Sequence, residues 1–257
     1  AFLCQPDQQL VDALLGQGVL IPGLAGIDHF RVTPHHVQDW LRHQPVIDHD
    51  IVHVAGHFTL DVDVRLPARG VTALFGHSGS GKTTLLNLIG GLDQVTSGDV
   101  LVGDMALSQM DEQDLARYRR HRVGFIFQGN NLITTLTAFE NIEIPLILIN
   151  APHRKSRVQA LLKDIGLADK AHMFPQYLSA GEQQRVAVAR AVVHSPEIVL
   201  ADEPTANLDA KNGAEILCLL QRLNRQLRRS ILLSTHDPRI IENSDNVLWL
   251  SDGRLVS

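Results

Sequence analysis

The sequence has few cysteines and no long apolar run. Cys4 and Cys218 are the only cysteines among its 257 residues, and they lie far apart. Two such cysteines exclude a disulfide framework and a paired-cysteine metal site, which favours a reducing, cytosolic setting. The longest apolar stretches, such as "IPLILI" at residues 144–149, are much shorter than the roughly 20 residues that span a bilayer. If a membrane matters to this chain, a different chain supplies the span.

The sequence also lacks a strong excess of charge of either sign. Its formal net charge is −5, and acidic and basic residues are interspersed. A protein whose main task is to grip nucleic acid or an acidic membrane surface carries a large basic excess. The composition therefore predicts no nucleic-acid partner and no direct binding to an acidic membrane.

The first 48 residues differ from the rest, and we interpret them as an N-terminal extension of unknown role. Residues 16–26 are Gly-rich, and Thr33-Pro34 ahead of "HHVQDWLRH" predicts a short helix. Histidines are frequent up to residue 57, at His29, His35, His36, His43, His49, His53 and His57. Their spacing matches no metal-ligand motif, so solvated or structural histidines are favoured over a metal site.

Residues 49–257 alternate strands with helices and predict one α/β domain with a mainly parallel sheet. "HFTLDVDVRL" at 57–66 alternates apolar and polar residues as a half-buried strand does, whereas Val71–Phe75 is a continuous apolar run typical of a buried parallel strand. Further strands are predicted at Val123–Phe127, Glu197–Asp202, Ser230–Thr235 and Asn246–Gly253, and helices at Lys82–Leu92, Gly181–Val193 and Asn212–Leu227. Residues about 131–178 interrupt this alternation and predict a helical subdomain.

A glycine-rich loop follows the first buried strand directly. "GHSGSGKT" at residues 76–83 satisfies G-x-x-x-x-G-K-[ST] and lies between a predicted strand and a predicted helix. Gly76, Gly79 and Gly81 let backbone N–H groups turn inward around phosphate oxygens. Lys82 would place its charge against the β- and γ-phosphates, and the Thr83 hydroxyl can bind Mg²⁺. The loop predicts a nucleoside triphosphate site but not the kind of protein that carries it.

Polar residues end three further strands at the same predicted sheet edge. "IVLADE" at 198–203 finishes in two acids. Asp202 would hold Mg²⁺ and its waters, and Glu203 would orient and deprotonate an attacking water. The alternative, that these acids merely end a strand, is weakened by the phosphate loop at the same edge. His236 and Gln128 also follow strands and could reach the γ-phosphate or the metal, although each alone would be an ordinary turn residue.

The segment "LSAGEQQRVAVAR" at 178–190 allows two interpretations. Ser179 followed by Glu182 ahead of an apolar-periodic run is the pattern of a helix capping box. A small-residue turn that opens onto a helix N-terminus is also suited to bind an anion. The residues themselves leave open whether this is a helix start or half of an active site.

These segments occur in one order along residues 50–257: "GHSGSGKT", "FQGNN", "LSAGE", "IVLADEPT", "ANLD" and "STHD". In order and spacing they resemble the ATP-binding cassette (ABC) ATPases. The resemblance implies a P-loop NTPase fold of the ABC type, in which a mainly parallel sheet is joined by an antiparallel β subdomain and a helical subdomain. It also implies that the chain binds ATP and Mg²⁺ and hydrolyses ATP.

The resemblance gives each motif a role. The ATP-binding loop comprises Gly76, His77, Ser78, Gly79, Ser80, Gly81, Lys82, Thr83 and Thr84. The catalytic set is Glu203 as base with His236 and Gln128, the Mg²⁺ ligands are Thr83, Gln128 and Asp202, and the D-loop residue is Asp209. The signature residues, which bind the γ-phosphate of ATP held by a second chain, are Leu178, Ser179, Ala180, Gly181 and Glu182. The capping box and the phosphate site would then be the same atoms.

The resemblance further implies a homodimer that powers transmembrane permease subunits, and hence a cytoplasmic protein held at the inner face of the cell membrane. "LADEPTANLD" and "RRHRVGFIFQGNN" look like the lipoprotein-release and macrolide-export ATPases, whereas "HFTLDVDVRLPARGVTALFG" looks more like the molybdate-importer ATPases. A non-transporting ATPase of the cell-division type shares the same chemistry and stays an alternative. Soluble DNA-repair or translation ATPases need a coiled coil or a second cassette, and the sequence has neither.

Two positions depart from the family pattern. Ala180 stands where the signature usually has glycine; if that position needs a positive φ or a close approach to phosphate, alanine costs about 1–2 kcal/mol. The aromatic residue that usually stacks on adenine precedes the phosphate loop, but "QPVIDHDIVH" at 44–53 contains none. Phe30, Trp40, His49 and His53 are the candidates to replace it.

Overall fold

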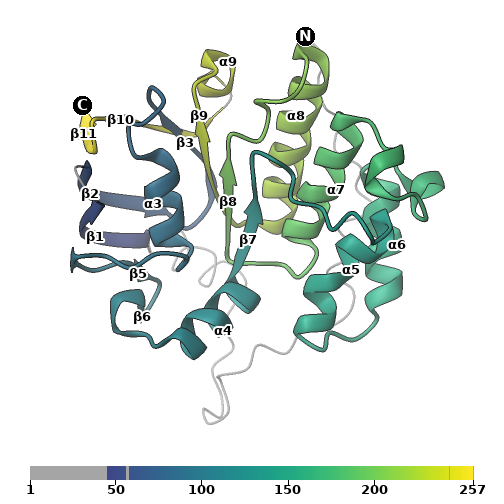
Figure 1. Cartoon of the computed structure of the whole chain (residues 1–257), viewed down its shortest axis with the longest axis horizontal. Coiled ribbons are helices and arrows are strands. Elements are labelled where there is room, and N and C mark those ends of the chain that lie inside the picture. The colour runs from purple at the N-terminus through teal and green to yellow at the C-terminus, as the bar shows by residue number, and fades with distance from the viewer. Residues whose placement is uncertain (1–44, 56–57, 243, 257) are drawn as a thin grey trace, which may run out of the picture. The chain divides into compact units, whose positions relative to one another are not determined.

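The computed structural model describes residues 45–55, 58–242 and 244–256 (Figure 1), and for residues 45–52, 54–55 and 239 it describes the backbone only. Several predictions from the sequence fall outside this part: those for residues 1–44, including the helix after Pro34, and those for the side chains of Phe30, Trp40 and His49. The other histidines outside it are His29, His35, His36, His43 and His57.

The strands are β1 Pro45–Ala55, β2 Phe58–Pro67, β3 Gly70–Phe75, β4 Ser97–Gly98, β5 Leu101–Val102, β6 Met105–Ala106, β7 Val123–Ile126, β8 Ile198–Asp202, β9 Ser230–Thr235, β10 Asn246–Ser251 and β11 Arg254–Val256. The α-helices are α3 Lys82–Ile89, α4 Glu112–Arg122, α5 Ala138–Leu148, α6 Arg154–Asp164, α7 Ala180–Val192, α8 Ala210–Leu227 and α9 Pro238–Ile241. Short 3₁₀ turns lie at η1 Leu107–Gln109, η2 Ala168–Lys170 and η3 Pro175–Tyr177.

The main sheet has the strand order β11-β10-β3-β9-β8-β7. Its strands are parallel except for β11, which forms an antiparallel hairpin with β10. All six residues of β9 are buried, as are the four central residues of β3. Strands covered on both faces need continuous apolar runs, which explains why these two were readable from the sequence. The predicted mainly parallel sheet is confirmed.

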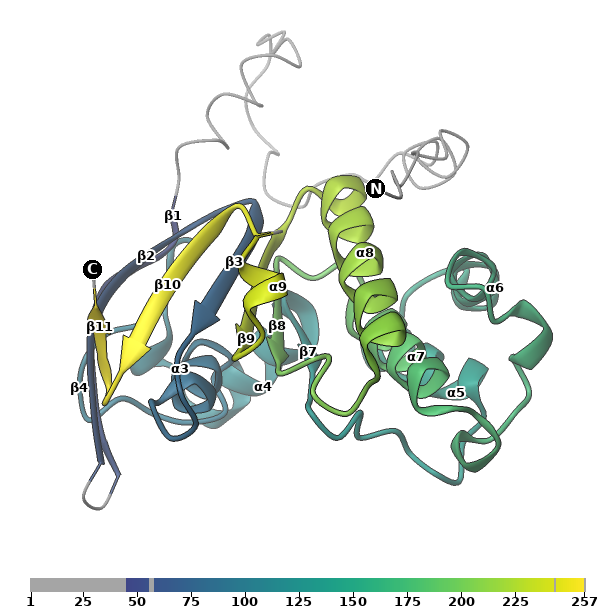
Figure 2. The ribbon, with the colours of Figure 1, turned by 90° about the horizontal axis from the view of Figure 1, so that it is seen from above.

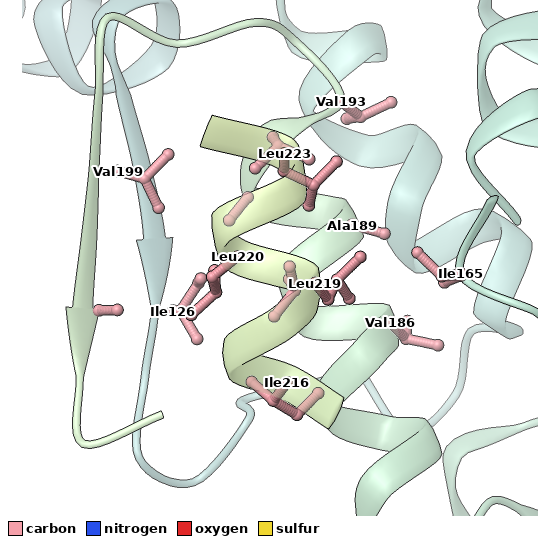
Figure 3. Close-up of a cluster of buried hydrophobic side chains, with 14 of the residues drawn as sticks. Ile126, Ile165, Val186, Ala189, Val193, Val199, Ile216, Leu219, Leu220 and Leu223 are labelled. Carbon is pink, nitrogen blue, oxygen red and sulfur yellow. The ribbon is translucent and has the colours of Figure 1, made fainter. Parts of the chain in front are cut away.

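Two hydrophobic clusters cover the two faces of this sheet, and Figure 2 shows helices on both sides of it. Ala73 of β3 points into the cluster made with α5, α7 and α8, whereas its neighbour Leu74 points into the cluster made with α3, α4 and β2. Figure 3 shows Leu219, Leu220 and Leu223 of α8 packed in the first cluster. Burying each such leucine stabilises the fold by about 1.5–3 kcal/mol, so the sheet is a rigid support for the loops at its edge.

A separate antiparallel sheet has the order β2-β1-β4. Along β2, Leu60, Val62, Val64 and Leu66 are buried and alternate with exposed residues, as the sequence predicts for a half-buried strand. Its partner β1 was not predicted, although it pairs with β2 along its length. The strand begins at Pro45, ahead of the domain start expected at residue 49.

The predicted helical subdomain contains α5, α6 and two 3₁₀ turns. Helix α5 begins with a capping box between Thr137 and Glu140. The fully buried Asn141 bonds to the backbone of Ile133, Leu136 and Thr137, which fixes the loop ahead of the helix. The apolar residues 144–148 form the end of α5, and Ile149 caps it. No helix within the described ranges is long and apolar enough to cross a membrane.

Some element ends and several elements differ from the sequence predictions. Helix α3 ends at Ile89 and not at Leu92, because Gly90 caps it and Gly91 takes φ +64° to begin a turn. Helix α4, the short strands β4 to β6 and strand β11 were not predicted. Only Leu115 and Tyr118 of α4 are buried, so its charged sequence carries almost no apolar stripe.

Candidate nucleotide-binding site

A cleft of ≈ 570 Å³ lies at the C-terminal edge of the main sheet. It brings together residues predicted from four separate segments: Ser78, Gly79, Gly81, Lys82, Thr83, Thr84, Gln128, Asp202, Glu203 and His236. Phe58, which was not predicted, also lines it. The loops after β3, β7, β8 and β9 meet here because the carboxyl ends of parallel strands share one edge.

The glycine-rich loop has a backbone conformation that residues with side chains rarely adopt. Gly79 and Gly81 have φ values of +81° and +106°, in the left-handed region that favours glycine. A Cβ on Gly76 would lie 2.2 Å from the Leu250 carbonyl oxygen, so this position needs glycine for space. The Ser80 carbonyl accepts a hydrogen bond from the Gly253 N–H at 2.9 Å. The loop is therefore fixed from the β10–β11 hairpin as well as from its own strand and helix.

Lys82 lies inside this loop and is only 6% exposed. Its Nζ donates to the carbonyl oxygens of Gly76 at 2.6 Å and His77 at 2.9 Å. Burial lowers the pKa of Lys82, while the nearby carboxylates of Glu203 and Asp202 act in the opposite direction. The cation is thus held at the loop beside two acids. His77 itself is exposed and does not line the cleft.

The two acids at the end of β8 make different contacts. Asp202 Oδ2 accepts from the Thr83 hydroxyl at 3.0 Å, which joins the phosphate loop to β8. Asp202 Oδ1 accepts from the Ser234 hydroxyl of β9 at 2.6 Å. Glu203 Oε2 lies 3.1 Å from His236 Nδ1, and its side chain is 19% exposed. Asp202 is therefore tied to the loop, whereas Glu203 faces the open part of the cleft together with the histidine.

Gln128 lines the cleft from the loop that follows β7. Its backbone carbonyl accepts from Asn207 Nδ2 at 2.9 Å. Asn130 and Asn131, which follow Gln128 after one glycine, have positive φ, and their carbonyls accept from the Arg190 guanidinium of α7 at 2.7 Å each. This loop is accordingly held by α7 and by the segment after Glu203, so a shift of either would move Gln128.

The signature segment lies at the start of α7, and its residues 178–182 do not line the cleft. The predicted capping box is confirmed: the Glu182 N–H donates to Ser179 Oγ at 3.4 Å, and the Ser179 N–H donates to Glu182 Oε2 at 2.9 Å. Hydrogen bonding from Lys170 and then from the Ser179 N–H lowers the pKa of Glu182. Ala180 is exposed and its φ is not positive, so the first condition under which alanine would cost stability here, a positive φ, is not met.

Asp209, the predicted D-loop residue, caps the N-terminus of α8. It accepts from the backbone N–H of Asn212 at 2.9 Å and from Asn212 Nδ2 at 2.6 Å, and the Asn212 bonds lower the pKa of Asp209. A Cβ on Gly181 would lie 2.5 Å from Asn212 Oδ1. Asn212 thus stands between the D-loop residue and the signature helix.

Of the four residues predicted to stack on the adenine base, His53 is the one whose side chain the structure describes, and it does not line the cleft. His53 is 8% exposed and lies at another place, with Nδ1 2.8 Å from the Gln94 carbonyl and Nε2 3.5 Å from Asp93. Phe58 lines the cleft and packs against Gly81 so closely that a Cβ there would lie 2.8 Å from Phe58 Cζ. In the sequence, Phe58 is an aromatic residue at the first position of β2. It could be connected with the nucleotide site only once the fold placed it beside the phosphate loop.

No three histidine, cysteine, aspartate or glutamate side chains gather as a metal site in the part of the chain that the structure describes. Beside the phosphate loop, the Thr83 hydroxyl and a carboxylate oxygen of Asp202 lie 3.0 Å apart. Such a pair is an incomplete ligand set without a further oxygen-bearing group such as a phosphate.

Comparisons with known proteins agree with this geometry. The family profile described as "ABC transporter" matches residues 60–206. An uncharacterized ABC transporter ATP-binding protein of Mycobacterium tuberculosis is 46% identical over 79% of this chain and 81% of its own length. The lipoprotein-releasing system ATP-binding protein LolD of Anaeromyxobacter dehalogenans is 43% identical over 76% and 83%.

A longer relative and a solved structure extend the comparison. The macrolide export ATP-binding/permease protein MacB of Burkholderia pseudomallei is 41% identical over 76% of this chain, which spans only 30% of MacB. The dimeric ATP-binding cassette MJ0796, in a post-hydrolysis state bound to ADP and Pi, superimposes with a TM-score of 0.71 and 36% identity, over 82% of this chain and 96% of that one. The chain therefore belongs to the ABC transporter family, as an ATP-binding and ATP-hydrolysing subunit.

Proposed function

We propose that the cleft binds one ATP through its phosphates and that a second copy of the chain completes the site with its signature helix. The observation that carries this proposal is the distribution of the motifs. The loop of Lys82, the acid Glu203 and His236 line one cleft, while the N-terminus of α7 does not. An anion-binding helix end that is separate from the cleft needs a second molecule to reach the same phosphate.

Within one chain, each residue of the cleft has a separate role in binding or hydrolysis. Lys82 neutralises phosphate charge, and the N–H groups at the start of α3 bind phosphate oxygens. Glu203 takes the proton of the attacking water, and His236, 3.1 Å away, holds its carboxylate in place. Gln128 contacts the bound phosphate, and its movement shifts the loop that Arg190 and Asn207 hold. Phe58 offers a flat apolar surface beside Gly81 for the adenine base.

Thr83 and Asp202 suit a magnesium ion. Their oxygens lie 3.0 Å apart and are of the hydroxyl and carboxylate types that Mg²⁺ prefers, and phosphate oxygens complete such sites. When bound, Mg²⁺ neutralises charge that develops on the phosphates. Gln128, which lines the same cleft, is the third candidate ligand.

The output of the cycle is proposed to be mechanical. Closure of two chains around two nucleotides would drive a separate transmembrane permease, with this chain at the inner face of the cell membrane. The similarity to LolD and MacB favours a partner of the lipoprotein-release or macrolide-export type. The substrate is selected by that partner and not by this chain.

Substitution Glu203→Gln tests the assignment of the site. The variant should bind ATP, form a stable dimer in size-exclusion chromatography with light scattering, and lose turnover by about a hundredfold or more. Glu242→Gln, at an exposed glutamate after α9, is the matched control and should behave as wild type. Near-normal hydrolysis by Glu203→Gln would remove Glu203 from the role of base.

A further inference from the structure

One buried hydroxyl joins the two acids of the site. Ser234 is the fifth residue of β9 and is 0% exposed. Its Oγ donates to Asp202 Oδ1 at 2.6 Å and accepts from the Glu203 backbone N–H at 2.9 Å. A serine hydroxyl has one donor proton and lone pairs to accept with, so both bonds form at once. Ser234 was not among the residues predicted from the sequence.

The backbone of Glu203 explains why this contact matters. Asp202 is paired with Ser234 at the last register position of β8 and β9, and the chain leaves the sheet at the next residue. Glu203 has φ +45°, in the left-handed region that residues with side chains rarely adopt. The structure around such a residue must hold it in place. Ser234 does so by accepting from the N–H of Glu203, the residue that turns toward the cleft.

The same hydroxyl also fixes which oxygen of Asp202 faces the phosphate loop. Because Asp202 Oδ1 is bonded to Ser234, Asp202 Oδ2 is the oxygen that accepts from Thr83 Oγ1 at 3.0 Å. A rotation of the half-buried Asp202 carboxylate would leave the fully buried Ser234 hydroxyl without its acceptor, and a lost partner is costly for a buried polar group. One side chain therefore sets the orientation of both acids.

We propose that Ser234 is a positioning residue for ATP hydrolysis, whose hydroxyl orients the Asp202 carboxylate and holds the turn that presents Glu203 to the attacking water. The inference rests on the proposed roles of Asp202 and Glu203. Ser234 touches neither nucleotide nor water itself. It acts through the two acids, and its loss affects turnover rather than the binding of ATP.

The same strand supplies a matched control. Ser230, at the start of β9, is also 0% exposed, but its hydroxyl has no hydrogen-bond partner within the described part of the chain. Ser230→Ala and Ser234→Ala remove the same atom from the same strand at the same burial. A general effect of deleting a buried hydroxyl from β9 would appear in both variants, whereas a positioning effect appears only at Ser234.

The experiment measures kcat, the KM for ATP, the Mg²⁺ concentration at half-maximal rate, and thermal unfolding. Ser234→Ala should lower kcat by about tenfold or more and raise the half-maximal Mg²⁺ concentration, with KM for ATP within about twofold of wild type. Ser230→Ala should leave kcat unchanged. Ser234→Thr and Ser234→Val form a second pair, equal in shape, and only the threonine variant should recover turnover.

Three results would overturn the inference. The first is a kcat for Ser234→Ala within about twofold of wild type at saturating Mg²⁺ and ATP. The second is an equal loss of kcat in Ser230→Ala. The third is equal turnover of Ser234→Thr and Ser234→Val. The comparison of these two variants also tests the role of the hydroxyl if Ser234→Ala folds poorly. Glu203→Gln separates the two proposals: if that variant is inactive and Ser234→Ala is normal, only the positioning role fails. Full turnover in Glu203→Gln would instead contradict the site assignment.

Discussion

Two helices in this chain begin in ways that suit an anion, and they begin differently. Helix α3 follows Gly81, which has φ +106° and no side chain to cap the helix, and the first turn of α3 contains no acidic residue. Helix α7 follows Ser179, which makes a full capping box with Glu182, and Glu182 also bonds Lys170 at 2.5 Å. The first helix keeps its N–H groups and its dipole free for a ligand, whereas the second satisfies part of its own end.

This difference supports the proposal that one chain contributes a part to each of two sites. No side chain caps the α3 start, so in the proposed function the single chain binds ATP there. The α7 start is capped within its own chain, and in the proposed dimer Ser179 would exchange an internal bond for one to phosphate. Such an exchange is favourable only when a second chain brings the phosphate close. The following substitutions separate the two helix starts.

The largest effect is expected from Lys82→Ala at the α3 start. Among the residues that the structure describes, Lys82 is the only lysine or arginine that lines the cleft, and charge-assisted bonds to phosphate are strong. ATP affinity, measured by isothermal titration calorimetry, should fall by about a hundredfold. Lys163→Ala, at an exposed position of α6, is the control and should bind ATP normally. Equal affinity in the two variants would mean that phosphate binds elsewhere.

Ser179→Ala tests the α7 start against an equivalent cap. Losing either capping box, by Ser179→Ala or by Thr137→Ala at α5, should destabilise the fold by about 1 kcal/mol in chemical unfolding. Only Ser179→Ala should lower ATP turnover, by about tenfold, with ATP affinity of the single chain unchanged. If both variants lose turnover equally, the cap serves stability alone.

Phe58→Ala asks whether the α3 site recognises the nucleotide base or phosphate alone. Stacking of a base on an aromatic ring contributes about 1–3 kcal/mol, so ATP affinity should fall about tenfold. Binding of inorganic tripolyphosphate, which has no base, should be unchanged, and Phe58→Trp should retain ATP binding. A matching loss for tripolyphosphate would show that Phe58 only supports the loop at Gly81.

The smallest effect is expected from Ala180→Gly. Ala180 begins α7 with no positive φ, so glycine relieves no strain and lowers the free energy of unfolding by at most about 1 kcal/mol. Steady-state turnover should change by less than about threefold, because the alanine Cβ is exposed. A tenfold gain would contradict this and would show that the Cβ obstructs the second chain.

The sequence predicts best what is local. The strands β3 and β9 carry apolar runs, the phosphate loop is one continuous motif, and the Ser179–Glu182 box lies within four residues, so each was readable without the fold. Strand β1 was missed because "PVIDHDIVHVA" mixes histidines and acids with its apolar residues and is ordered by pairing with β2. Local pattern alone could not show that pairing.

The contacts that were missed at the site join distant segments. Ser234 meets Asp202 across a separation of 32 residues, and Phe58 meets Gly81 from a different strand. A serine inside an apolar strand does not by itself indicate a role in the nucleotide site, and neither does a phenylalanine at the start of a strand. The contact of Ser234 follows from the strand order, which places β9 beside β8. The contact of Phe58 follows from the packing of β2 against the β10–β11 hairpin, where the Asp61 N–H donates to the Gly253 carbonyl.

A mixing experiment can show whether the α3 start of one chain works with the α7 start of another. Lys82→Ala and Ser179→Ala chains are each assayed alone and then combined. If the two helix starts act across chains, the mixture should recover about a quarter of wild-type turnover, because half of the dimers are mixed and each of those has one intact site. A mixture no more active than the average of its parts would contradict the account.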